Sequence, residues 1–122
     1  MQIVDFEQGT PYGPFRKSID IFQDGSLILL PLFGHSAGQM GLIVNCSESE
    51  RYFLCVDAVY CRDNYEEMAY GSILTNAVHA NIRQYHDLYK VLNRIWKANP
   101  DLEIIPSHDP DIYRECFGPL PK

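Results

Sequence analysis

Residues 31–38 read Pro-Leu-Phe-Gly-His-Ser-Ala-Gly, a histidine flanked by glycines at the end of an apolar run. The run, Leu27–Phe33, predicts a strand, and the glycines let the backbone turn tightly around His35. Two further strand-like runs end in a similar way, in Val56-Asp57-Ala58-Val59-Tyr60 and in Pro106-Ser107-His108-Asp109. A histidine, a carboxylate and a second histidine therefore each follow a predicted strand, where metal ligands can converge on one edge of a sheet.

The composition is that of one globular domain. The chain has 122 residues, of which 46% are hydrophobic and 12% aromatic, enough for a single core. A net charge of −6 with scattered Lys and Arg disfavours binding to nucleic acid or to an anionic membrane surface. The first residues lack a signal-peptide pattern, and no apolar run reaches membrane-spanning length. We therefore expect a cytoplasmic protein whose four cysteines are reduced, since none forms a Cys-x-x-Cys pair.

Apolar runs separated by turn residues predict an antiparallel meander in the first half of the chain. Its four expected strands are Ser18–Phe22, Leu27–Phe33, Met40–Cys46 and Tyr52–Val56. Asp24-Gly25 is a typical two-residue hairpin turn between the first two. The nearly continuous apolar character of Leu27–Phe33 predicts that both of its faces are covered.

The second half of the chain predicts helices and one more strand. Apolar residues recur at intervals of three and four over Asn81–Ala98, which is typical of an amphipathic helix. A helical turn is expected at Asp63–Met68, a strand at Leu102–Ile105, and a short helix at Asp109–Cys116 with Asp109 as its N-cap. The predicted fold class is α/β: an antiparallel-rich sheet with a long amphipathic helix.

Three side chains are candidate metal ligands: His35, Asp57 and His108. Asp57 follows four apolar residues, a position where a carboxylate needs a cation or hydrogen bonds to compensate for lost solvation. Tyr60 would reach the same place, where a phenol can donate to a developing oxyanion, so Asp57 and Tyr60 are the candidate catalytic residues. Asp109 could fix the tautomer of His108, although helix capping is the more economical role.

Each candidate residue can also be explained by a purely structural role. Taken alone, His35 is explained better by an exposed surface loop than by a function, and Tyr60 is explained equally by an amphipathic rim position. Cys61 is close enough to Asp57 in sequence to face a site, whereas Cys55 is expected to be a small buried core residue. His86 falls on the polar face of the predicted helix, so a solvated surface explains it.

In this order, the three motifs resemble the C-terminal half of metallo-β-lactamase-fold hydrolases, and most closely the N-acyl homoserine lactonase-like branch. The resemblance spans about residues 18–112. It implies an αββα sandwich, of which residues 1–122 form a single partial domain. It also implies that His35 and His108 bind one zinc ion each, that Asp57 bridges both, and that Tyr60 assists the substrate carbonyl during lactone or ester hydrolysis.

The chain departs from this family at one decisive point. The His-x-His-x-Asp-His motif, which supplies four metal ligands from the family's N-terminal half, is absent. A catalytic zinc needs about three protein ligands and a water, so His35, Asp57 and His108 can hold one ion at most.

We therefore expect a metal-dependent hydrolase fragment that is inactive alone, with an ester or lactone as its small-molecule substrate. Half a sandwich leaves sheet surfaces uncovered, which predicts self-association or a complementary N-terminal half as partner. The alternatives are a non-catalytic half-domain that acts in binding or assembly, and a simple one-metal protein.

Overall fold

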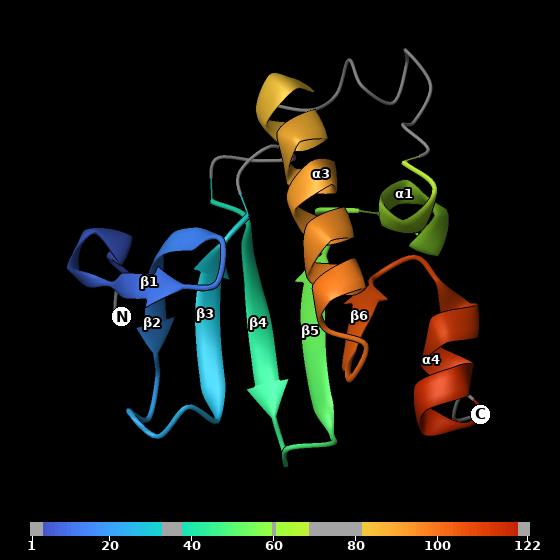
Figure 1. The fold of residues 1–122 in the computed structure, drawn as a ribbon, viewed down its shortest axis with the longest axis horizontal. Coiled ribbons are helices and arrows are strands. Elements are labelled where there is room, and N and C mark those ends of the chain that lie inside the picture. Colours follow the sequence, from blue (N-terminus) through green and yellow to red (C-terminus); the bar gives the residue numbers. More distant parts are fainter. Residues whose placement is uncertain (1–3, 33–37, 60, 69–81, 120–122) are drawn as a thin grey trace.

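The computed structural model describes residues 4–32, 38–59, 61–68 and 82–119. Within these ranges the chain forms one six-stranded sheet, with the strands side by side in sequence order (Figure 1). In chain order the elements are η1 (Phe6–Gln8), β1 (Thr10–Tyr12), β2 (Phe15–Asp20), β3 (Leu27–Pro31), β4 (Met40–Asn45), β5 (Arg51–Val56), α1 (Arg62–Glu66), α3 (Ile82–Ala98), β6 (Leu102–Pro106) and α4 (Pro110–Phe117). Among the described helices, none has both the length and the apolar character that crossing a membrane requires.

The predicted meander is confirmed, because β2, β3, β4 and β5 are successive antiparallel neighbours. The β2 strand begins earlier than expected, since β1 pairs with it and the Ser18 hydroxyl donates to the Thr10 carbonyl at 2.8 Å. The connection after β2 is longer than a two-residue turn. It is closed by the Asp20 carboxylate, which accepts from the Gly25 N–H at 2.8 Å while Gly25 takes a φ of 79°.

The last strand, β6, pairs in parallel with β5, with Phe53 opposite Ile104 and Leu54 opposite Ile105. A parallel pair needs a long crossover connection, and here α1 and α3 lie within that connection. Because the two strands run in the same direction, their C-terminal ends reach the same edge of the sheet. This pairing is what brings the segments after Val56 and after Pro106 together.

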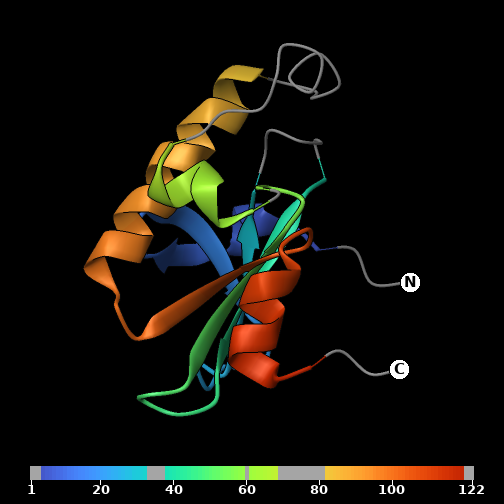
Figure 2. The same ribbon diagram turned by 90° about the vertical axis from the view of Figure 1, so that its right-hand side faces the viewer.

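One face of the sheet packs against α1 and α3 and carries the core (Figure 2). From the sheet, the buried side chains include Leu30, Ile43 and Phe53, and from α3 they include Tyr89 and Leu92. The 17-residue α3 presents an apolar stripe to this core, as its sequence periodicity predicted. The Asn93 side chain of α3 donates to the Tyr65 carbonyl at 2.6 Å, which fixes α1 beside α3.

The opposite face of the sheet is also apolar, but it is only partly covered. A row of aliphatic residues crosses five neighbouring strands in register: Ile19, Leu29, Leu42, Leu54 and Ile105. Along β3, residues alternate between buried and half-buried, so the prediction that both faces of this strand are covered holds for the helical side only. The helix α4 lies beside β6, on the side of the sheet opposite α1 and α3 (Figures 1 and 2), and its Phe117 contacts Tyr52 with ring centroids 5.4 Å apart.

Candidate functional site

The candidate site lies at the edge where β5 and β6 end together. The Ser107 N–H donates to the Val56 carbonyl at 3.1 Å, which extends the strand pairing to the last residue of β5. Val56 has a φ of 49°, a left-handed backbone conformation that is strained for a β-branched residue. Such strain persists where the surrounding structure holds it, often beside functional groups, and Asp57 is the next residue.

Asp57 and His108 meet at this edge. The Nε2 atom of His108 lies 3.1 Å from Oδ1 of Asp57, and the same carboxylate oxygen accepts a hydrogen bond from the Ser107 hydroxyl at 2.5 Å. The side chains of Asp57 and His108 are 36% and 62% exposed. The predicted convergence of these two residues is therefore confirmed, and both side chains are partly exposed to solvent.

These donor atoms are of the types that zinc binds, a carboxylate oxygen and an imidazole nitrogen. They form a pair rather than a complete ligand set, because no group of three or more His, Cys, Asp or Glu suited to a metal occurs among the described residues. The chemistry of Asp57 and His108 thus fits part of a metal site. His35 and Tyr60 lie outside the described residues, so their roles remain predictions.

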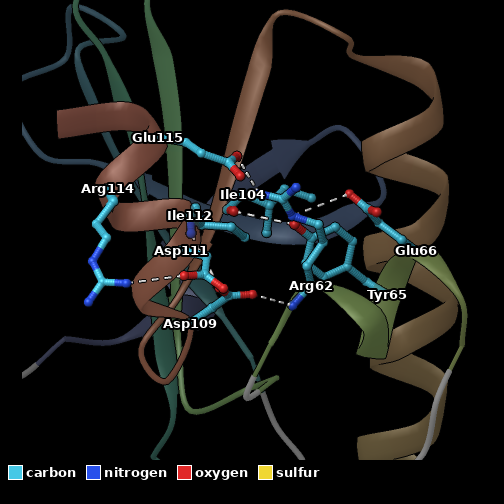
Figure 3. Close-up of polar contacts among 9 residues, drawn as sticks. All are labelled: Arg62, Tyr65, Glu66, Ile104, Asp109, Asp111, Ile112, Arg114 and Glu115. Atoms are coloured by element: carbon cyan, nitrogen blue, oxygen red, sulfur yellow. Dashed lines mark hydrogen bonds and ion pairs between the residues drawn. The ribbon is translucent and has the colours of Figure 1, made fainter. Parts of the chain in front are cut away.

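The Asp109 carboxylate confirms the predicted helix cap and makes a second contact that the sequence did not reveal. Its Oδ1 accepts from the Ile112 N–H of α4 at 3.2 Å, and its Oδ2 accepts from the Arg62 N–H of α1 at 2.9 Å (Figure 3). The Arg62 guanidinium in turn bonds to Glu115 of α4 at 2.5 Å. The two helices that leave the site are therefore joined to each other.

Two hollows flank His108. One, of about 420 Å³, is mainly apolar and lies against the partly covered sheet face, with Leu54, Ile105 and Tyr113 in its wall. The other, of about 410 Å³, is polar and includes Cys61 and Arg62. The imidazole thus stands between an apolar and a charged surface.

The remaining candidate residues, Cys61, Cys55 and His86, lie in different surroundings. Cys61 borders the polar hollow with His108, as its sequence position allowed. Cys55 is buried, donates to the Ile105 carbonyl at 3.6 Å, and has its thiol pKa raised to about 12 by burial. It is the core residue that the sequence predicted. His86 is half-buried on α3 near Tyr89, with ring centroids 6.4 Å apart.

Sequence reasoning missed the role of Ser107, which orients the Asp57 carboxylate. The available signal was a hydroxyl residue directly before His108 at a strand end. It also missed Arg62, whose N–H contacts a carboxylate 47 positions away.

Comparison with solved structures identifies the class of fold. The chain superposes on an N-acyl homoserine lactone hydrolase that has its product N-hexanoyl-L-homoserine bound at the catalytic metal centre, with a TM-score of 0.63 and 21% identity over 81% of this chain and 36% of that one. A quorum-quenching N-acyl homoserine lactone lactonase gives a TM-score of 0.59 and 23% identity, covering 75% of this chain and 35% of that one. The α/β fold is therefore part of the metallo-β-lactamase-type fold of lactone hydrolases, as expected.

Sequence relatives point to a particular group within this class. The chain is 30% identical over 94 residues to the N-acyl homoserine lactonase AttM of Rhizobium radiobacter, covering 77% of this chain and 34% of the relative. It is 31% identical over 91 residues to AttM of Rhizobium johnstonii, covering 75% of this chain and 32% of that one. No family model matches. The resemblance to the N-acyl homoserine lactonases is confirmed, and the chain spans about a third of the length of these relatives.

Proposed function

We propose that this chain supplies part of the active site of a metal-dependent lactone hydrolase, with Asp57 and His108 as metal ligands. The observation that carries the proposal is the 3.1 Å approach of His108 Nε2 to Asp57 Oδ1 at the shared end of β5 and β6. The fold around this pair matches lactone hydrolases, and one matched structure holds its product at a metal centre.

Each residue of the chain has a distinct task in this proposal. Asp57 and His108 bind the ion, His35 is a third ligand, and Tyr60 donates a hydrogen bond to the substrate carbonyl oxygen as negative charge develops there. Ser107 fixes the orientation of the Asp57 carboxylate by donating to Oδ1. When bound, zinc would supply a Lewis acid and a hydroxide nucleophile at neutral pH.

The ligand count limits what the chain does alone. Three ligands are enough for one ion with an open position, but a two-ion centre needs further donors. We propose that a complementary segment carrying a His-x-His-x-Asp-His motif provides them, and that the chain is a partial domain, inactive without that segment. The similarity to N-acyl homoserine lactonases favours a lactone substrate such as an N-acyl homoserine lactone.

The partly covered face of the sheet supports the proposal that a complementary segment packs against it. In the apolar row, Leu29, Leu42 and Leu54 are half-buried, and on the same face Val56 and Met40 are 44% and 39% exposed. Burying apolar surface contributes about 25 cal/mol per Å², so a second sheet placed here would bind favourably. Self-association through the same face is the competing use of this surface.

A zinc titration tests the ligand assignment. By calorimetry, the chain should bind one zinc ion, and Asp57→Asn and His108→Ala should each weaken binding about tenfold or more. His86→Ala is the matched control, because it removes a histidine on α3 rather than one at the site. If both site variants bind zinc as tightly as the unsubstituted chain, the assignment is contradicted.

A complementation assay tests the activity. The chain is mixed with a lactonase segment that carries the His-x-His-x-Asp-His motif, and ring opening of an N-acyl homoserine lactone is followed. We expect hydrolysis that Asp57→Asn abolishes. If the two pieces form a stable complex without hydrolysis, the alternative is favoured, a non-catalytic half-domain that uses its apolar sheet face for binding or assembly.

A further inference from the structure

We infer that Asp109 is a positioning residue, which holds Asp57 and His108 together by tying α1 to α4. The metal-binding role of that pair rests on the proposed function. The tie itself is a structural coupling, and it can be tested without metal or substrate.

The unusual feature is that one carboxylate serves two helices. An N-cap side chain ordinarily accepts from one or two N–H groups of its own helix. Asp109 instead divides its oxygens, with Oδ1 on Ile112 of α4 and Oδ2 on Arg62 of α1, at 3.2 and 2.9 Å (Figure 3). The second bond does nothing for α4: it satisfies the first N–H of α1, which has no partner within its own helix, so the carboxylate caps α4 and also joins α1 to it.

The helix to which Asp109 is tied is itself well anchored. Tyr65 of α1 is buried, its hydroxyl donates to the Ile104 carbonyl of β6 at 3.4 Å, and its own carbonyl accepts from Asn93 of α3 at 2.6 Å. The position of Arg62, the first residue of α1, is therefore held by these contacts. By accepting from the Arg62 N–H, Asp109 holds the segment after β6 next to the start of α1.

The candidate ligands lie between two hydrogen bonds that join the same two segments. At the strand ends, Ser107 bonds to Val56 through backbone atoms, and at the helix starts Asp109 bonds to Arg62. Asp57 and His108 lie between these two ties, one on each segment. Ordering a residue costs conformational entropy, so segments already fixed at both ends hold their ligands in place before an ion arrives.

The Arg62–Glu115 ion pair joins the same helices but is a weaker candidate for this task. Its side chains are 36% and 62% exposed, and exposed pairs contribute little because water and salt screen them. The tie that positions the site is therefore the Asp109 carboxylate rather than the charges beside it.

Substitutions at Asp109 separate capping from coupling. Asp109→Ser keeps a good N-cap for α4, but its single, shorter hydroxyl cannot also reach Arg62. Asp109→Asn keeps one acceptor oxygen and directs an amide NH₂ at the other N–H. Asp111→Asn is the matched control, since Asp111 is an exposed carboxylate on the same helix that contacts Arg114 at 3.3 Å.

The experiment uses the metal-free chain, isotope-labelled and studied by NMR. Asp57→Asn first gives the shift of the His108 ring signals that accompanies loss of their contact with the carboxylate. In Asp109→Ser we expect the His108 signals to move in the same direction, and the Arg62 amide to exchange with solvent about tenfold faster or more. The Ile112 amide should remain protected, and Asp111→Asn should leave all three readouts unchanged.

An unchanged His108 signal together with faster exchange at Arg62 would overturn the inference, because the tie would then be broken without effect on the site. If Asp109→Ser fails to fold, the same His108 and Arg62 signals are measured in Asp109→Asn, and the same outcomes decide. Zinc titration separates the two proposals. Should Asp57→Asn not weaken zinc binding, the proposed function fails, while the His108 and Arg62 signals still decide whether Asp109 couples the segments.

Discussion

The two faces of the sheet both carry apolar side chains, but only the face toward α1 and α3 buries them fully. Phe53 points into the helical side and is fully buried, whereas its neighbour Leu54 points to the other side and is half-buried. Ile43 and Leu42 of β4 repeat this contrast. The difference shows that the described helices leave part of the apolar surface of this sheet uncovered, because they fully bury the side chains of one face only.

The largest expected effect tests that contrast directly on β5. Phe53→Ala should lower the free energy of unfolding by about 3–5 kcal/mol, since it removes a large buried side chain and leaves a cavity. Leu54→Ala, one residue along, should cost about 1 kcal/mol, because the side chain keeps contact with water. Urea unfolding measures both. Equal losses would mean that the second face is packed as tightly as the first.

Charge placed on β4 sharpens the same comparison. Ile43→Lys should unfold the chain, because it buries an unpaired ammonium group. Leu42→Lys should preserve the fold, as judged by circular dichroism, and weaken self-association or binding of a complementary segment about tenfold or more. Sedimentation velocity measures the association. Unaltered association in a folded Leu42→Lys variant would remove this face as the docking surface.

The buried thiol of Cys55 gives a pH-dependent signature of the covered face. Burial raises its pKa from 9.0 to about 12. Above pH 9 the unfolded thiol loses its proton while the folded one keeps it, so stability should fall as the pH rises from 9 toward 12. The slope should be shallower in Cys55→Ala, measured by urea unfolding at several pH values. An identical slope would show that Cys55 is not protected from solvent.

The smallest effect is expected where α1 and α4 meet at the surface. Glu115→Gln removes the charge that pairs with Arg62, and both side chains are substantially exposed. We expect a loss of about 0.2–1 kcal/mol, reduced further by added salt. A thermal melt with and without 0.5 M salt, about three times physiological ionic strength, measures it. A much larger loss would assign the helix contact to this ion pair instead of to Asp109.

Local patterns made most of the fold predictable. Apolar runs separated by turn residues identified the meander, and the spacing of apolar residues identified α3. The short helix after Asp109 was predicted from its cap. The β1 strand was missed because proline and glycine around Thr10–Tyr12 favour a loop, although pairing with β2 overrides that preference.

Contacts between distant residues were harder to predict. That Asp57 and His108 would converge followed from their positions after strands, and the structure confirms it. The parallel pairing of β5 with β6, which causes the convergence, is not visible in any single segment. The bonds of Ser107 to Asp57 and of Asp109 to Arg62 span 50 and 47 positions, and nothing in the local sequence marks them.

The crossover between β5 and β6 also has a kinetic consequence. Neighbouring strands of the meander can pair soon after they leave the ribosome, because their partners are close along the chain. The Asp57–His108 pair must wait until a loop of 51 positions has closed, and contacts of such long range form slowly. Assembly of the ligand pair is thus expected to be a late event in folding, after the hairpins of the sheet are in place.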